Sequence, residues 1–449
     1  MKRSILILAG VAVCATTVMA NPKLSPMRGT EYSSQYSWKE TLPFKVTAAK
    51  ERFNDLSAPR RVDLNGDGIL DWFLVGPLNP KNKNWKGTEA DSFCGGARCV
   101  GAVDPVPLVY MGQKDNENFV NVSHLFVDNR EVKGVSMPTN TLLSDFNGDG
   151  KPDFFITDHG FGGAGNKGYR DSYYLSQPDG TWLESSSTHL SNSDYVIFDH
   201  GGATGDIDND GDVDIVLTNL KGYLTCWMND GTGKMSLVEV CGAGTFALSV
   251  DLGDFNGDGC LDVVHAAHDW MPSNQHTPSG FILGDCKGNF NQGFFGKNTT
   301  KFDAKYGTLA GNAPHIFAYD VNKDGLMDVV ASRTGKLYVG TFVEIKLNKG
   351  NMKFESTLIS LVDTPKDFVP KNEGNEWNHF ITYINFEDVD ADGDVDMLLF
   401  GGGWNAIGAE RVHGAAMLND GTGHFKHAPI RAEGNPTVRG INQMFPPSK

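Results

Sequence analysis

The sequence lacks the short motifs of several common catalytic classes. It contains no G-x-S-x-G turn, no H-E-x-x-H pair, no C-x-x-C pair and no phosphate-cradling glycine loop. It therefore gives no support for a serine hydrolase, a zinc site or a nucleotide-binding fold. Basic residues are also few, 39 Lys and Arg against 55 Asp and Glu. The formal charge of −16 argues against nucleic acid and anionic membranes as partners.

Long apolar runs are absent as well. Two basic residues precede a short apolar stretch at residues 5–13, and Val18-Met19-Ala20 offers the small residues of a cleavage site. This pattern predicts a signal peptide over residues 1–20, and Val13 disfavours the alternative of a lipid anchor at Cys14. No later run approaches the length of about 18 apolar residues that a membrane helix needs. We expect an exported monomer without membrane insertion, located outside the cell, on its surface or in the periplasm.

Cysteines are few, and six remain after the predicted signal peptide. An even number in an exported chain favours disulfides over free buried thiols, although six cysteines allow about 15 pairings. We expect sequence neighbours to pair. Cys94 with Cys99 closes a small loop, and Cys260 with Cys286 joins the start of one strand to the end of the next.

What the sequence does contain is one acidic pattern, D-x-[DN]-x-D-G-x-x-D, in six copies. The copies are Asp63–Asp71, Asp145–Asp153, Asp206–Asp214, Asp254–Asp262, Asp320–Asp328 and Asp388–Asp396. Ca²⁺ prefers about six to eight oxygen ligands, which a tight loop supplies from side chains at positions 1, 3, 5 and 9 and a carbonyl at position 7. Glycine at position 6 permits the sharp turn. The pattern therefore predicts up to six structural Ca²⁺ ions.

The predicted ligand residues follow directly from these positions. They are Asp63, Asn65, Asp67, Ile69 and Asp71; Asp145, Asn147, Asp149, Lys151 and Asp153; Asp206, Asp208, Asp210, Asp212 and Asp214; Asp254, Asn256, Asp258, Cys260 and Asp262; Asp320, Asn322, Asp324, Leu326 and Asp328; and Asp388, Asp390, Asp392, Asp394 and Asp396.

Each acidic copy runs into a short apolar segment such as Ile215-Val-Leu-Thr, which indicates a buried strand and disfavours the flanking helices of an EF-hand or dockerin. A later turn such as Asn229-Asp-Gly or Asn419-Asp-Gly marks a hairpin. Each unit thus reads as strand, acidic loop, strand, longer loop, strand, hairpin and strand. We predict an all-β fold, a β-propeller of six four-stranded antiparallel blades that fills residues 21–449 as a single domain. Units begin near residues 55, 138, 200, 247, 314 and 380.

Two alternatives to this architecture stay open. Segments 21–50 and 430–449 could add a seventh blade, and a linear solenoid is less favoured because the repeat spacing is long and irregular.

The acidic loop, the apolar strand and the Leu418-Asn-Asp-Gly-Thr-Gly-His-Phe hairpin resemble the FG-GAP/VCBS repeats of integrin-α-like propellers. The resemblance covers roughly residues 55–430 and implies a calcium-loaded binding or adhesion module.

The predicted topology places all acidic loops on one face of the propeller, and function usually lies on loops that a rigid scaffold carries. The opposite face gathers histidine, tryptophan and charged residues of the kind that bind sugars or peptides. The candidate ligand-binding residues there are Asp158, His159, His200, His265, His268, Trp270, His315, Arg333, His379 and Trp404.

Three functions fit these features. The first is a binding module for a glycan or protein ligand. The second is a polysaccharide lyase or hydrolase in which His265, His268 and Arg333 take part in proton transfer. The third is a purely structural surface protein whose opposite face caps the central channel.

Overall fold

The computed structural model describes most of the repeats. The described residues are 60–67, 71–75, 107–112, 119–130, 135, 138–159, 168–243, 246–247, 249–266, 279–290, 311–365, 367–369, 371, 376–377, 380–388, 390, 392–402, 407–408, 411–412 and 415–428. In this part of the chain no helix has the length and hydropathy of a membrane span. The predicted signal peptide and the Cys94–Cys99 pair lie outside the described residues.

Almost every regular element is a strand, as predicted, and the strands form six sheets. The first sheet contains β1 (Arg60–Val62), β2 (Asp71–Leu74), β3 (Leu108–Gly112) and β4 (Phe119–Asn121). The second contains β5 (Phe126–Val127), β6 (Pro138–Ser144), β7 (Asp153–Asp158), β8 (Ser172–Ser176) and β9 (Trp182–Glu184). The third contains β10 (Asp199–Gly205), β11 (Asp214–Asn219), β12 (Tyr223–Asn229) and β13 (Met235–Ala243).

The remaining sheets follow in chain order. The fourth contains β14 (Ser249–Gly253), β15 (Asp262–Ala266) and β16 (Gly280–Ile282). The fifth contains β17 (Asn312–Tyr319), β18 (Asp328–Thr334), β19 (Thr341–Asn348) and β20 (Phe354–Val362). The sixth contains β21 (Phe380–Glu387), β22 (Asp396–Gly402), β23 (Ala415–Asn419) and β24 (Phe425–Ala428). The described helices are single turns: η1 (Ser123–Leu125), α3 (Ser186–His189) and η4 (Lys336–Tyr338).

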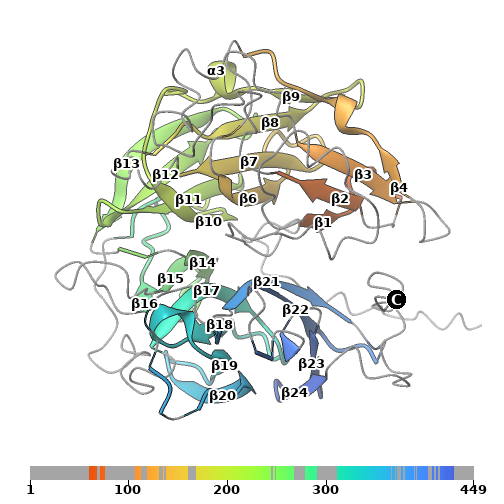
Figure 1. Ribbon diagram of the computed structural model, residues 1–449. Helices are drawn as coiled ribbons and strands as arrows, with labels where there is room; N and C mark the ends of the chain where they lie inside the picture. The colour runs from red at the N-terminus through yellow and green to blue at the C-terminus, as the bar shows by residue number, and fades with distance from the viewer. Residues whose placement is uncertain are drawn as a thin grey trace, which may run out of the picture.

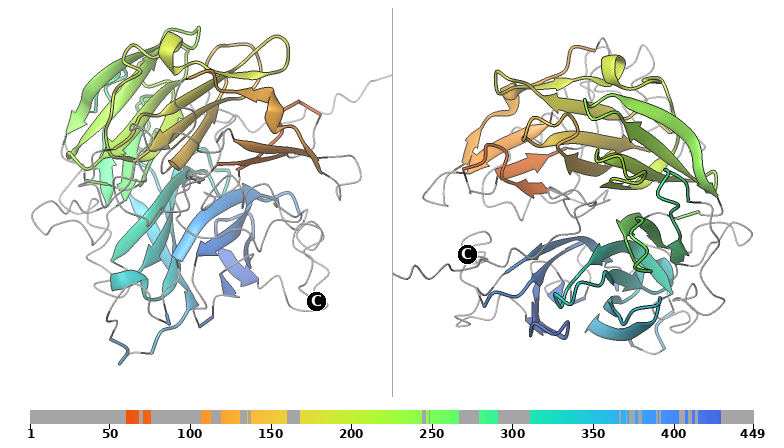
Figure 2. Two further views of the ribbon diagram at one scale, coloured as in Figure 1. Left: turned by 45° about the horizontal axis from the view of Figure 1, so that its top comes forward. Right: turned by 180° about the vertical axis from the view of Figure 1, so that it is seen from behind.

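The sheets follow one another around a common centre (Figures 1 and 2). The first strand of each sheet lies toward the middle of the molecule, and the later strands lie progressively outward (Figure 1). From β6 onward, consecutive first strands touch: β6 contacts β10, β10 contacts β14, β14 contacts β17, and β17 contacts β21. Each acidic copy connects the first strand of its sheet to the second, as the sequence predicts. All six loops therefore lie at the same end of their sheets.

Apolar side chains from neighbouring sheets form a separate core at each of the five successive junctions. Between the second and third sheets, Phe155, Leu217 and Trp227 are buried together. Between the fifth and sixth, Val330, Val343 and Leu399 do the same. In the second to fifth sheets the central strands are apolar on both faces, because each of these sheets packs against a neighbour on both sides. Burial between sheets, at about 25 cal/mol per Å² of apolar surface, is the main force that holds the sheets together.

The prediction of four strands in every unit is wrong for the second sheet. β5 adds a fifth strand, which runs parallel to β9. Phe126 of β5 stacks on Trp182 with ring centroids 4.8 Å apart and also contacts Phe73 of the first sheet. The segment joins this sheet because its aromatic side chain fills the core between the first two sheets. In the described residues the fourth sheet has three strands.

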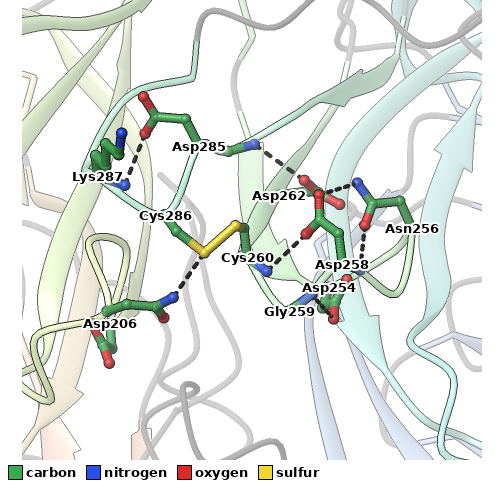
Figure 3. Close-up of a disulfide and its surroundings, with 12 residues drawn as sticks. Asp206, Asp254, Asn256, Asp258, Gly259, Cys260, Asp262, Asp285, Cys286 and Lys287 are labelled. Atoms are coloured by element: carbon green, nitrogen blue, oxygen red, sulfur yellow. Dashed lines mark hydrogen bonds between the residues drawn. A yellow bond between two sulfur atoms is a disulfide. The ribbon is translucent and has the colours of Figure 1, made fainter.

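Two disulfides join sequence neighbours, as expected. Cys226 and Cys241 cross-link the outer strands β12 and β13 within the core. Cys260 and Cys286 join the fourth acidic loop to the hairpin that follows β16 (Figure 3). The Cys260–Cys286 pairing was named from the sequence and is confirmed.

Candidate functional site

The acidic loops fold around their own carboxylates. In the second copy, the backbone N–H of Asp149 donates to Asp145 Oδ1 at 3.0 Å, and the N–H of Gly150 donates to Asp145 Oδ2 at 2.8 Å. The third, fifth and sixth copies repeat both contacts. Gly150 has a φ of +84°, the left-handed conformation for which the pattern requires glycine at position 6. The position 1 carboxylate thus organises the turn in each of these copies.

Carboxylate oxygens converge where position 3 is also aspartate. In the third copy, oxygens of Asp206, Asp208 and Asp210 lie within 4.8 Å of one another. The corresponding residues of the sixth copy, Asp388, Asp390 and Asp392, do the same. Burial raises the pKa of Asp208, and the charge of Asp210 raises it further. Like charges at this spacing repel, and a bound cation would relieve the repulsion.

Position 7 contributes its carbonyl to the predicted ligand set, and its N–H holds the position 5 carboxylate. Cys260 N donates to Asp258 Oδ1 at 2.8 Å, and Leu326 N donates to Asp324 Oδ1 at 2.9 Å. Lys151, Asp212 and Asp394 make the same contact in their loops. Ile69, the position 7 residue of the first copy, lies outside the described residues.

The aspartate at position 9 has a structural role that the sequence does not reveal. It is fully buried in all six copies. In the third copy, Asp214 Oδ2 accepts the N–H of Ile207 at 3.1 Å, and Oδ1 accepts the N–H of Asn229 at 2.8 Å. The carboxylate therefore ties the acidic loop to the end of the third strand. The third-strand contact recurs at Gly112, Ser176, Gly284, Asn348 and Asn419.

Burial dominates the protonation of these position 9 groups. It raises the pKa of Asp71 to about 6, that of Asp153 to about 7 and that of Asp214 to about 8, although the backbone N–H donors act in the opposite direction. Each oxygen of Asp214 accepts one N–H and keeps a second lone pair, whereas Asp153 Oδ2 accepts the N–H groups of both Phe146 and Asn147. The group can therefore hold its backbone partners and still offer oxygen to a cation.

Asparagine residues at the hairpins connect neighbouring sheets. Asn229 Nδ2 donates to the carbonyl of Phe146, at position 2 of the preceding loop, at 2.9 Å. Asn348 makes this bond to Phe255 at 3.1 Å, and Asn419 makes it to Val321 at 2.7 Å. We call this contact the Asn latch. It fixes the position of one acidic loop against the next sheet.

These loops match the chemistry of calcium better than that of other common metals. The oxygens that converge in the third and sixth loops are carboxylates, and the pattern adds amide and carbonyl oxygens from the same turns; Ca²⁺ prefers such oxygen ligands. Positions 1, 3 and 5 and the carbonyl at position 7 would hold the ion, and position 9 would add its remaining lone pairs.

The opposite face carries a compact group where the second and third sheets meet. Asp158 ends β7, His159 follows it directly, and His200 lies at the start of β10. The ring centroids of His159 and His200 are 5.9 Å apart, and His159 stacks on Phe198 at 4.5 Å. Three of the ten candidate ligand-binding residues, Asp158, His159 and His200, are thus brought together.

Two acids beside this group were not predicted from the sequence. Asp171 Oδ1 accepts the N–H of Asp158 at 3.0 Å. Burial raises the pKa of both Asp171 and Asp199, and the charge of Asp158 raises both further. Ionising both Asp171 and Asp199 would cost free energy, because the two carboxyl groups are buried.

The other described candidates do not join this group. His265 lies in β15 and His315 in β17, and both are buried. Arg333 of β18 is 1% exposed, and its Nε donates to Glu344 Oε2 at 2.5 Å. Glu344 also pairs with Lys346 at 2.7 Å, so two cations of the fifth sheet share one carboxylate. His268, Trp270, His379 and Trp404 lie outside the described residues.

Comparison with known proteins identifies the repeat. The chain is a repeat protein built from β-sheets, and the FG-GAP-like repeat family matches residues 145–217 and 206–265. Residues 145–265 therefore contain FG-GAP-like repeats, as the acidic loops and hairpins predict. These two matches cover the second, third and fourth acidic loops.

Single relatives are more distant. The chain is 26% identical over 216 residues to a T-cell immunomodulatory protein homolog of Plasmodium falciparum (isolate 3D7). The match covers 45% of this chain and spans 28% of the length of that relative.

Solved structures resemble the chain weakly. The V. cholerae biofilm matrix protein Bap1 matches with a TM-score of 0.32 and 17% identity, over 65% of this chain and 39% of Bap1. AofleA from Arthrobotrys oligospora matches with a TM-score of 0.32 and 11% identity, over 65% of this chain and 69% of its own. Similarity at this level does not bear on what the chain binds.

Proposed function

We propose that the chain is an exported, calcium-stabilised β-propeller that acts as a binding module for a glycan or protein ligand. In this proposal residues 21–449 form one monomeric domain, and the six sheets are its blades. The main support is the repetition of one acidic loop at the same place in every sheet, with a hydrophobic core at each described junction. The two disulfides agree with an oxidising location.

Calcium has a structural role in this proposal. Each loop gathers three or four carboxylates, and the ion offsets their repulsion and fixes the connection between the first two strands of a blade. Because Asn latches join an acidic loop to the next blade at three junctions, ions in those loops stabilise the arrangement of the blades. The scaffold then presents the opposite face rigidly to a ligand.

We place the ligand where the second and third blades meet, at Asp158, His159 and His200. His200 is half-buried, so part of its surface faces solvent, whereas His159 is packed beneath it. Buried acids with raised pKa values next to histidines are typical of functional sites because a core seldom keeps such groups without a use. The partly exposed imidazole of His200 can exchange hydrogen bonds with sugar hydroxyls or peptide carbonyls.

A labelled full-length chain applied to a glycan array and to an array of secreted proteins tests this proposal. Binding should fall at least about tenfold in His200→Ala, the loss of one or two hydrogen bonds to the ligand. The matched control is His424→Ala, an exposed histidine in the hairpin after β23, at the end of the sheets that carries the acidic loops. Binding to neither array, or binding that His200→Ala leaves intact, would contradict the proposal.

A purely structural role is the second candidate. His265 and His315 are buried, and the charge of Arg333 is matched by Glu344. These contacts suit residues that stabilise strands near the centre. The same burial weakens the case for a lyase or hydrolase that uses His265 and Arg333, because a proton-transfer group must reach its substrate.

A further inference from the structure

The junction of the third and fourth sheets is built differently from its neighbours. At three other junctions an Asn latch donates to the position 2 carbonyl of the preceding loop. In the fourth sheet the corresponding residue is Gly284, whose N–H donates to Asp262 Oδ1 at 3.1 Å, as the latch residues do in their own sheets. Gly284 has no side chain, so the latch is missing here.

The backbone explains why a side chain is excluded. A Cβ atom at Gly284 would lie 2.1 Å from the carbonyl oxygen of Leu261, far inside van der Waals contact. An asparagine therefore cannot occupy this position without moving the fourth acidic loop. Another contact must hold the hairpin against the third loop.

The hairpin of residues 285–289 supplies that contact through its backbone and through Cys286. Gly288 N donates to the carbonyl of Ile207 at 3.1 Å, and Ile207 is the position 2 residue that a latch would reach. Asn209 Nδ2, from the third acidic loop, lies 2.7 Å from Cys286 Sγ. Cys286 is bonded to Cys260 in the fourth loop (Figure 3). The disulfide thus stands between two acidic loops.

The cysteine in the fourth loop occupies a ligand position. Cys260 is the position 7 residue, whose carbonyl belongs to the predicted calcium ligands, and its N–H holds Asp258 at 2.8 Å. Cys286 has a φ of +56°, a conformation that a non-glycine residue adopts at a cost. The disulfide fixes both residues. It therefore orients a calcium ligand and holds the hairpin in a conformation that favours contact with the third loop.

The two disulfides differ in access to solvent. Cys226 and Cys241 are both 0% exposed and belong to the core between the third and fourth sheets. Cys260 and Cys286 are both partly exposed. Thiol–disulfide exchange requires a thiolate to reach one sulfur, so a soluble dithiol should attack the exposed bond first.

We propose that Cys260–Cys286 is an exchangeable disulfide that replaces the missing Asn latch and sets the calcium affinity of the fourth loop. This inference rests on the proposed calcium role of the loops. A dithiol thiolate attacks one sulfur and releases the other cysteine as a thiolate, which takes a proton. The second thiol of the reagent then closes its own disulfide and releases the first cysteine. The chain gains two thiols, and the reagent is oxidised.

Calcium titration of the full chain against a chromophoric chelator tests this inference. The oxidised chain is compared with a chain treated with mild dithiothreitol and alkylated, and with the double variant Cys260→Ser/Cys286→Ser without reductant. We expect one binding event to weaken about 10- to 100-fold in both, the usual loss when a group that orients a metal ligand is removed, while the other events remain. Mass mapping should find Cys260 and Cys286 alkylated and Cys226 and Cys241 protected.

The possible failures are distinct. Unchanged calcium binding in the double variant would overturn the inference but leave the calcium role intact. Resistance of Cys260–Cys286 to a reductant that opens Cys226–Cys241 would also overturn it. An oxidised chain that takes up no calcium would contradict the proposed calcium role itself.

Discussion

The Asn latch makes a quantitative prediction about the contact between blades. Asn348 is 1% exposed and makes three hydrogen bonds: its Nδ2 donates to the carbonyls of Phe255 and Met327, both at 3.1 Å, and its Oδ1 accepts the N–H of Gly350 at 3.0 Å. Asn348→Ala removes all three and leaves buried carbonyls without that donor. At about 1 kcal/mol for each bond, plus the cost of unpaired buried groups, the loss in unfolding free energy should be about 2–4 kcal/mol.

Urea unfolding at saturating calcium measures this loss. The matched control is Asn192→Ala, because Asn192 is exposed, and substitutions at such sites change stability by no more than about 0.5 kcal/mol. A loss in Asn348→Ala as small as that of the control would refute the idea that the latch holds the fourth and fifth sheets together.

Two further predictions concern buried charges. In metal-free buffer, burial raises the pKa of Asp153 and of Asp262 to about 7, so the folded chain binds protons more tightly than the unfolded chain. The stability that these two groups contribute is greatest below their ordinary pKa of 3.8 and is lost as the pH rises through about 7. Thermal unfolding of the metal-stripped chain should therefore show a falling Tm between about pH 5 and pH 8, and a Tm that rises over that window would contradict the reasoning. Glu344→Ala removes the buried carboxylate that pairs with both Arg333 and Lys346 and should cost about 3–5 kcal/mol in urea unfolding. Glu355→Ala, which breaks the exposed 3.6 Å pair with Lys349, should cost less than about 1 kcal/mol, and equal costs would argue against a buried charge pair.

The repeated part of the fold could be predicted from the sequence because its signals are local. Nine residues specify each acidic loop, and the apolar run after position 9 specifies the strand that follows. The hairpin turn after Asn229 and the pairing of Cys260 with Cys286 could also be predicted, because their signals lie close together in the sequence. β5 could not be foreseen, because the two residues Phe126 and Val127 join the second sheet through packing alone.

Much of the site depends on contacts between distant residues. The Asn latches join residues 83, 93 and 98 positions apart, and the sequence assigns these asparagines only to turns. Their recurrence at the same hairpin position was a signal that could have been used. Asp171 and Asp199 carry no motif, and they become a pair only when the second and third sheets meet. The sequence predicted Arg333 to lie on the ligand-binding face, because it does not show that the partner Glu344 lies on the neighbouring strand.

Calcium binding by the metal-stripped chain tests the central claim most directly. Calorimetric titration should show uptake by the acidic loops, and the Tm should rise with calcium concentration, since an ion at 100 times its Kd adds about 2.7 kcal/mol of stability for each site. A chain that takes up no calcium, and whose Tm is the same with calcium and with chelator, would contradict the claim that these loops hold the fold together through bound ions.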